Sequence, residues 1–187
     1  LLFSQINNGY DVWSPDNNMS LKTYTDDPGK DSQDTYGLSI NGDIVLNKHF
    51  KLKNIISMTN TKAYHSYDAD WGDSTYWVSV LGDGYFPIRD YYQESKNRLS
   101  YSIESRIYSN QVVLGIYKRE FQEKQDAIGY IYAGDGTDGS SDFKFNSIAG
   151  YLQYYIQPSE KFSFKSNIRY EIIDYLYKGE THYGDSV

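Results

Sequence analysis

The densest group of candidate metal ligands in this sequence surrounds Trp71. Asp68, Asp70 and Asp73 place three carboxylates in one short stretch, and Ca²⁺ in proteins takes several oxygen ligands of this kind. The stretch lacks the full calcium-loop pattern and its closing glutamate. Acidic, glycine-rich loops are usually hydrated without a bound ion, so the sequence assigns no metal site and no cofactor.

Aromatic residues in the same stretch form a second candidate site. Tyr67 and Trp71 flank the acidic residues, and Trp77 follows shortly after them. We take these three rings, with Asp68 and Asp70, as candidate ligand-binding residues. Such rings can stack on a ligand, but they can also pack a loop or lie at a membrane interface, where Trp and Tyr are enriched. The sequence leaves these alternatives open.

No catalytic group occurs in a recognisable setting. There is no Gly-x-Ser-x-Gly motif, and the three histidines are too far apart in sequence to show ligand spacing. The chain has no cysteine, which excludes disulfides and thiolate metal sites. We therefore predict that the protein is not an enzyme.

Composition limits the class of partner. The net charge of −7 argues against a nucleic acid, because phosphate binding needs clustered Lys and Arg. The apolar fraction of 39% is low for a self-contained core. The 21 tyrosines suit wet boundaries, since each has an apolar ring and a polar tip.

The elements that would position these residues are long segments in which apolar and polar residues alternate. The clearest is a pair of strands expected over 143–177, joined near Ser159. In its second half, apolar residues such as Phe164 and Ile168 share one parity, whereas Lys165, Arg169 and Glu171 share the other. Because successive side chains of a strand point to opposite faces, one face is apolar and the other is charged.

The same alternation predicts about seven strands, the others lying near 1–6, 33–46, 50–64, 94–108 and 111–124. In 111–124 both parities are apolar, so its facing stays open. Short turns near Lys48, Ser109 and Ser159 alternate with long loops near 7–31, 65–92 and 126–142. An antiparallel meander with this order would carry tight turns at one end and large loops at the other.

The predicted strands run to a dozen or more residues, beyond the ~5–6 residues usual in soluble proteins. A tilted strand needs ~9–11 residues to cross a bilayer, with short periplasmic turns and long extracellular loops. We therefore predict an all-β fold, an antiparallel meander forming part of a large transmembrane β-barrel in the bacterial outer membrane. The charged parity would line the lumen, and its members include Glu104, Arg106, Lys165, Arg169 and Glu171.

Several segments, taken in order, resemble TonB-dependent outer-membrane receptors. They are NGYDVWS at 8–14, TDDPGKD at 25–31, YDADWG at 67–72, VVLGIY at 112–117 and IRYE at 168–171. Asn167 stands where such receptors usually have Gly. Each segment is weakly specific, and the resemblance rests on their order along nearly the whole chain.

The resemblance implies a plugged barrel of about 22 strands that takes up an iron–siderophore complex or another scarce nutrient, powered by the TonB complex. The plug domain and the TonB-contacting segment would precede Leu1, so residues 1–187 are expected to be a partial β-barrel domain. The odd strand count also predicts an arc of a larger barrel, because single-chain bacterial barrels have an even number of strands. The implied partners are outer-membrane lipid, the plug, the TonB complex and a small nutrient ligand.

Other classes remain open at this point. A soluble β-sandwich that binds carbohydrate would show the same alternation, with the apolar faces of two sheets turned inward. A small outer-membrane β-barrel is a further alternative, and an outer-membrane enzyme would need a Ser–His pair in a recognisable context, which the sequence lacks.

Overall fold

The computed structural model describes the chain except residues 10–13, 17, 83–89, 132–134, 137–138 and 182–187. The described residues form an all-β structure with one short helix, α1 (Ser74–Leu81). The strands are β1 (Leu2–Gly9), β2 (Lys30–Val45), β3 (Lys51–Asp68), β4 (Tyr91–Tyr108), β5 (Val112–Ile131), β6 (Asp135–Gly136), β7 (Gly139–Ser159) and β8 (Phe162–Thr181).

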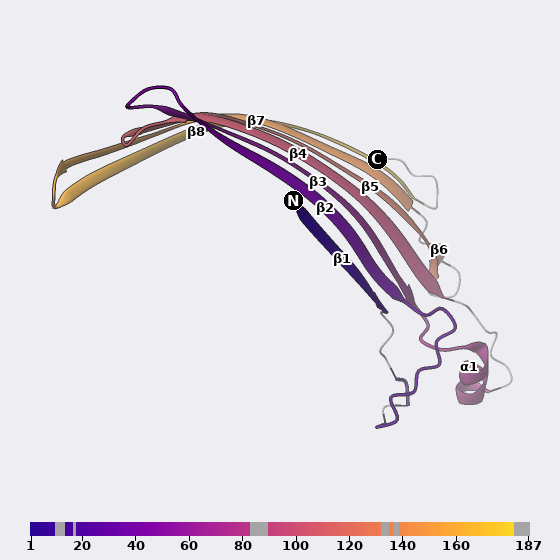
Figure 1. Ribbon diagram of the computed structural model, residues 1–187. Helices are drawn as coiled ribbons and strands as arrows, with labels where there is room; N and C mark the ends of the chain where they lie inside the picture. The colour runs from indigo at the N-terminus through magenta and orange to yellow at the C-terminus, as the bar shows by residue number, and fades with distance from the viewer. Residues whose placement is uncertain (10–13, 17, 83–89, 132–134, 137–138, 182–187) are drawn as a thin grey trace.

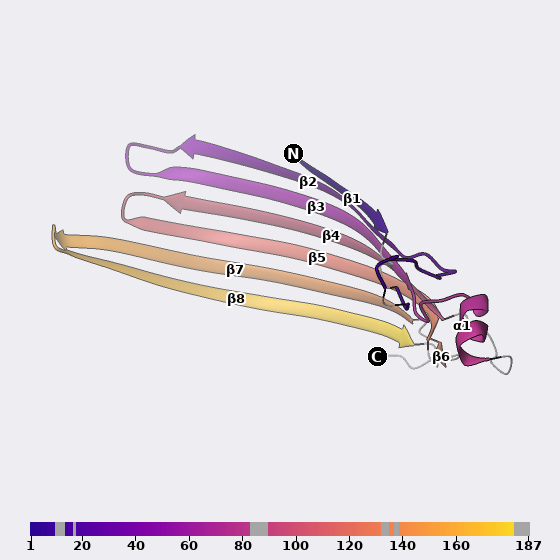
Figure 2. The same cartoon turned by 90° about the horizontal axis from the view of Figure 1, so that it is seen from below.

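The strands form a single antiparallel meander. Their order is β1-β2-β3-β4-β5-β7-β8, and the two-residue β6 pairs with β5. Figure 1 shows one curved layer, and Figure 2 shows the strands side by side with α1 and the long loops gathered at one end. The predicted all-β meander is confirmed. Across the described residues the sheet is open, with β1 and β8 at its two edges.

The long connections are shorter than the sequence pattern predicts. β3 extends to Asp68 and β4 begins at Tyr91, so the loop expected over 65–92 loses residues at both ends and contains α1. β5 and β7 likewise extend into 126–142, where Asp126 pairs with Ser140. Alternation fades where both faces of a strand are polar, but the backbone ladder continues because it does not depend on side-chain polarity.

The helix α1 begins and ends with recognisable caps. The Asp73 carboxylate accepts a hydrogen bond from Tyr76 N at 2.7 Å, which satisfies one of the free N–H groups of the first turn. Gly82, with φ 91°, follows the last turn and its N–H donates to Val78 O at 2.9 Å. Within the described residues there is no helix of the length and apolarity that a bilayer crossing requires.

Pairing gives the sheet two chemically distinct faces, because residues directly opposite in a ladder point to the same side. We call one the apolar face, defined by the paired row Ile44, Leu52, Ile107, Leu114, Leu152 and Ile168. The other is the polar face, defined by the row Asp43, Lys53, Arg106, Gly115, Tyr151 and Arg169. The register also resolves the facing of β5, since Leu114 belongs to the apolar face and Tyr117, paired with Glu104, to the polar face.

The apolar face is not covered by any other part of the described chain. Ile103 is 52% exposed, Leu114 55% and Ile168 67%. Among the described residues, Ala127 and Ala149 are the only buried apolar side chains. By contrast, the charged Glu104 and Arg106 on the polar face are partly buried, which indicates that the polar face is the inner side of the curved sheet, where side chains converge.

Exposed apolar side chains form a belt across the strands. On β2 it runs from Tyr36 to Ile44. On β8 it includes Phe164, Ile168, Ile172 and Leu176. Leu176 belongs to the paired row of Tyr36, and Ile168 to that of Ile44. On β8 the belt therefore covers the rows that it covers on β2, and Phe164 extends it further toward the short-turn end of the sheet.

Candidate functional site

The polar face is organised around Tyr151 on β7. Its ring lies over Gly115 of the neighbouring β5, in the space that a Cβ at Gly115 would occupy. The Tyr151 hydroxyl donates a hydrogen bond to Glu104 of β4, so one side chain connects three strands. Arg106 Nη1 lies 3.5 Å from Glu104 Oε1, which leaves the carboxylate between a phenol and a guanidinium.

Arg169 and Glu171 on β8 form a second pair beside this centre. Arg169 Nε donates to Glu171 Oε2 at 3.2 Å, and Arg169 Nη2 lies 3.1 Å from Glu171 Oε1. This is the bidentate geometry that favours Arg over Lys. The Arg169 guanidinium also lies 5.5 Å from the centroid of the Tyr117 ring, within the range of a cation–π interaction.

These groups line an open groove of about 620 Å³ between β4 and β8. Glu104, Arg106 and Arg169 are all part of its lining, so three of the five residues assigned to the lumen face lie together, with Glu171 bound to one of them. Lys165 has the same facing but pairs with Tyr155, nearer the β7–β8 turn. The groove presents both charges and phenol rings, with no arrangement of a nucleophile and base.

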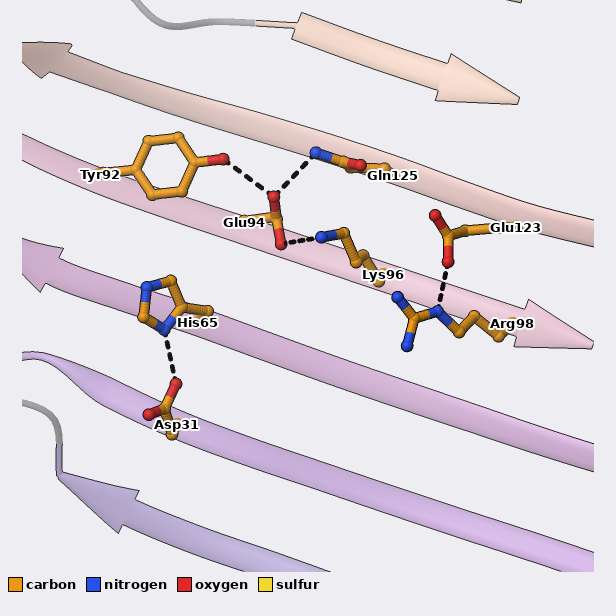
Figure 3. A network of polar contacts seen from close by, with 8 residues as sticks. All are labelled: Asp31, His65, Tyr92, Glu94, Lys96, Arg98, Glu123 and Gln125. Atoms are coloured by element: carbon orange, nitrogen blue, oxygen red, sulfur yellow. Dashed lines mark hydrogen bonds and ion pairs between the residues drawn. The ribbon is translucent and has the colours of Figure 1, made fainter. Parts of the chain in front are cut away.

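A second polar network lies nearer the long loops (Figure 3). Its centre is Glu94, which accepts hydrogen bonds from the Tyr92 hydroxyl at 2.9 Å and Gln125 Nε2 at 2.8 Å and pairs with Lys96 at 2.6 Å. Two cross-strand pairs flank it, Arg98 with Glu123 and His65 Nδ1 with Asp31 at 2.5 Å. The polar face therefore carries polar pairs along much of its length, some within one strand and others between neighbouring strands.

In the loops, the predicted site residues gather at the end of β3. The side chain of Asp68 is fully buried. Its Oδ1 accepts hydrogen bonds from Asp70 N at 3.2 Å and Trp71 N at 3.0 Å. Trp71 has φ 63°, a left-handed conformation that is uncommon for a bulky residue. Asp68 Oδ2 is also buried and has no hydrogen-bond partner among the described residues.

Asp70 lies beside Asp68 and is strongly perturbed by it. Its Oδ1 accepts from Gly72 N and its Oδ2 from Asp90 N, both at 3.2 Å. Burial, and next the neighbouring Asp68 carboxylate, raise the pKa of Asp70 to about 7, against the opposing effect of the two backbone donors. Ionising both neighbouring carboxylates in this partly buried site is therefore energetically unfavourable.

A third carboxylate comes from the other long loop. Asp26, in the connection between β1 and β2, joins Asp68 and Asp70 so that one oxygen from each lies within 4.8 Å of the others. We call these three residues the acidic cluster. Asp73, which the sequence groups with Asp68 and Asp70, instead caps α1. Asp26 has no local sequence signal that distinguishes it, because its position depends on contacts between loops distant in sequence.

The two loops are joined by backbone and ring contacts. Asp73 N donates to Tyr24 O at 2.7 Å, and Tyr24 forms an isolated parallel bridge with Gly72. The rings of Tyr24 and Tyr76 stack with centroids 4.4 Å apart. The Tyr24 hydroxyl donates to Asp16 Oδ2 at 2.7 Å, and this hydrogen bond raises the pKa of Tyr24.

The predicted aromatic residues contact one another within this assembly. Tyr67 stacks with Trp71 at 6.5 Å between centroids. Trp77, in α1, packs edge-on against Tyr76 at 5.1 Å. The structure thus brings Tyr67, Asp68, Asp70 and Trp71 to one turn, with Trp77 on the adjacent helix. These contacts pack the loops, and a role in binding a ligand stays a prediction.

The sequence pattern did not reveal several members of these sites. Tyr117 and Tyr151 have the polar-face parity, but an aromatic residue does not identify itself as polar-facing until the register is known. The alternation places Asp31 and His65 in loops, whereas the structure places them in β2 and β3, which continue beyond the alternating residues. Comparison of the chain with family models, with curated proteins and with solved structures finds no match in any of the three.

Proposed function

We propose that this chain forms part of the wall of a transmembrane β-barrel in the outer membrane, and that the barrel takes up a scarce nutrient in the manner of TonB-dependent receptors. The observation that carries the proposal is the exposed apolar belt on one face of a sheet whose other face is charged. The belt supports the membrane location, and the sequence resemblance supports the transport class.

The belt is difficult to reconcile with water on both sides of the sheet. Exposed apolar surface costs roughly 25 cal/mol per Å² relative to burial, and soluble monomers rarely expose contiguous apolar patches larger than a few hundred Å². A β-sandwich would cover the belt with a second sheet, whereas the described strands form one layer. Lipid covers such a belt without a second layer.

The polar face fits the lumen side of the same wall. Its carboxylates are paired with cations or phenols, as in Glu104 with Tyr151 and Glu123 with Arg98. A wall of this kind remains hydrated without isolated buried charges, whose burial is costly. In the proposal, further strands next to β1 and β8 complete the ring, and the loop end with α1 and the acidic cluster faces outward.

The proposal is tested with the protein expressed from its complete gene in a Gram-negative host. We expect it in the outer-membrane fraction, extractable only with detergent, with a gel mobility that changes on boiling as a folded barrel denatures. Under iron limitation it should support uptake of a labelled ferric siderophore, and uptake should stop in a strain that lacks TonB.

The outcomes separate the two parts of the proposal. Monodisperse protein in detergent-free buffer would overturn the membrane location and favour the soluble carbohydrate-binding alternative. A folded outer-membrane barrel whose uptake of every tested cargo is independent of TonB would retain the barrel and overturn the transport class.

A further inference from the structure

We propose that the acidic cluster of Asp26, Asp68 and Asp70 is a binding site for one calcium ion, which fastens the loop between β1 and β2 to the segment that follows β3. The site concerns the loops alone, so it goes beyond the proposed transport function.

The spacing of the carboxylates fits a single ion. Ca²⁺ binds oxygen ligands at about 2.3–2.6 Å, so two oxygens on one ion can lie up to about 5 Å apart. One oxygen from each of the three residues lies within 4.8 Å of the others. The donors are all carboxylates, which suit a hard cation, and the described residues place no His beside them, as a softer transition metal would favour.

The second observation is the buried, unpartnered oxygen of Asp68. The side chain is fully buried, and the Asp70 and Trp71 N–H groups donate only to Oδ1. Oδ2 is inaccessible and has no hydrogen-bond partner among the described residues. A buried carboxylate oxygen without a partner is costly, and a bound cation removes that cost while it also offsets the repulsion between Asp68 and Asp70.

The cluster joins two segments that backbone hydrogen bonds already hold together. Asp26 comes from the first loop, while Asp68 and Asp70 come from the end of β3. Ala69 N donates to Asp90 O at 2.8 Å and Asp73 N to Tyr24 O at 2.7 Å, so the backbone already brings the carboxylates into position. A cation bound by the three carboxylates would add a crosslink between the two segments to these backbone hydrogen bonds.

Calcium is favoured over magnesium for a physical reason. Mg²⁺ requires near-octahedral geometry at shorter distances and retains several waters, whereas Ca²⁺ accepts irregular ligand sets. The donors here come from two loops, and Asp26 is exposed while Asp68 is fully buried. Such an uneven set matches the more tolerant ion.

The test uses terbium, which replaces calcium and luminesces when nearby rings absorb; Tyr67 and Trp71 adjoin the cluster. The full-length protein in detergent is titrated with Tb³⁺ alone, and Ca²⁺ or Mg²⁺ is then added in competition. Asp26→Asn is the main variant, because Asp26 is the exposed member of the cluster and the change removes one charge while it nearly preserves the shape of the side chain. Asp27→Asn is the matched control, with the same change of charge one position along the loop.

We expect saturable Tb³⁺ luminescence that Ca²⁺ displaces at lower concentration than Mg²⁺. Asp26→Asn should weaken binding about ten-fold or more, since it removes one of three charged ligands, while Asp27→Asn should bind as the wild type does. As a readout independent of luminescence, the two loops are digested with a protease at a Ca²⁺ concentration that saturates only the wild type. Chelation should then increase the rate of cleavage in the wild type and leave the rate unchanged in Asp26→Asn.

Three results would overturn the site. They are no saturable luminescence in the wild type, equal weakening in Asp26→Asn and Asp27→Asn, or displacement by Mg²⁺ as effective as by Ca²⁺. The first would mean that a proton shared by Asp68 and Asp70, rather than a cation, compensates their charge. None of these results bears on TonB-dependent uptake, so the site and the proposed function fail separately.

Discussion

The ring of Tyr151 fills the space above Gly115 on the adjacent strand, and its hydroxyl reaches past that strand to Glu104. Because Gly115 has no side chain, Tyr151 of β7 can extend across β5 and contact β4. An aromatic ring over a glycine in a sheet also shields backbone that would otherwise be open.

We expect Gly115→Ala to destabilise the sheet by about 1–3 kcal/mol, because the added Cβ overlaps Tyr151 and must displace it from Glu104. Gly150→Ala is the matched control, since a Cβ at Gly150 has no atom within 4 Å. The folded fraction after extraction, read from gel mobility with and without boiling across a urea series, measures both. Equal midpoints for the two variants would refute the role given to Tyr151.

The apolar belt makes a prediction about charge on neighbouring residues of β7. Leu152 lies in the belt and pairs with Leu114 and Ile168, whereas Gln153 points to the polar face. Leu152→Arg should cost about 2–4 kcal/mol if the belt meets lipid at mid-depth, while Gln153→Arg should be tolerated. Yield of folded protein in the outer-membrane fraction measures the difference, and comparable yields would argue against a lipid-facing belt.

The acidic cluster predicts a pH dependence once divalent cations are removed. The pKa of Asp70 is raised to about 7 by burial and by Asp68, so the folded loop binds this proton more tightly than the unfolded chain does. The resulting stabilisation is fully present below the ordinary pKa of Asp and is lost as the pH rises through about 7. The groups that face the Asp70 carboxylate include the carboxylates of Asp26 and Asp68 and the backbone N–H of Asp90.

In chelator, the loops should therefore be cleaved more slowly by a protease at about pH 5 than at about pH 8, after correction for the protease's own pH profile on an unfolded substrate. Asp70→Asn should abolish most of that difference, because the amide does not titrate in this range. An unchanged ratio of rates in Asp70→Asn would place the pH dependence elsewhere.

The His65–Asp31 pair provides a test of the polar-face ladder nearer the loops. Asp31→Asn should lower stability by no more than about 1 kcal/mol, because both side chains are partly exposed and such pairs contribute little. Urea unfolding of the detergent-solubilised protein measures it. A loss several times larger would mean that this pair organises the loops as well as joining two strands.

Alternation was enough to predict the all-β meander and the charged facing of Glu104, Arg106 and Arg169, since side-chain direction in a strand depends only on parity. It could not give the facing of β5, because Leu114 and Tyr117 are both hydrophobic in character and only the register separates them. Nor could it give the strand ends near Asp31 and His65, where both faces are polar.

The full membership of the acidic cluster could not be predicted from the sequence. Asp68 and Asp70 are separated in the chain only by Ala69 and are predictable as a pair. Asp26 joins them through the Tyr24–Gly72 bridge and the Tyr24–Tyr76 stack, contacts between segments more than forty residues apart that no local pattern encodes. Asp73 is not a member of the cluster, and its carboxylate instead caps α1 by accepting a hydrogen bond from Tyr76 N.

The strand order has a consequence for how the sheet is built. Apart from the short β6, each strand pairs only with its neighbours along the chain. The sheet can therefore grow one hairpin at a time, each step closing a local loop rather than waiting for a distant partner, which lowers the entropic cost of every addition. At any stage the described sheet therefore offers unpaired backbone groups on two edge strands only, β1 and the most recently added strand, and new strands and unwanted ones alike would attach at these two edges.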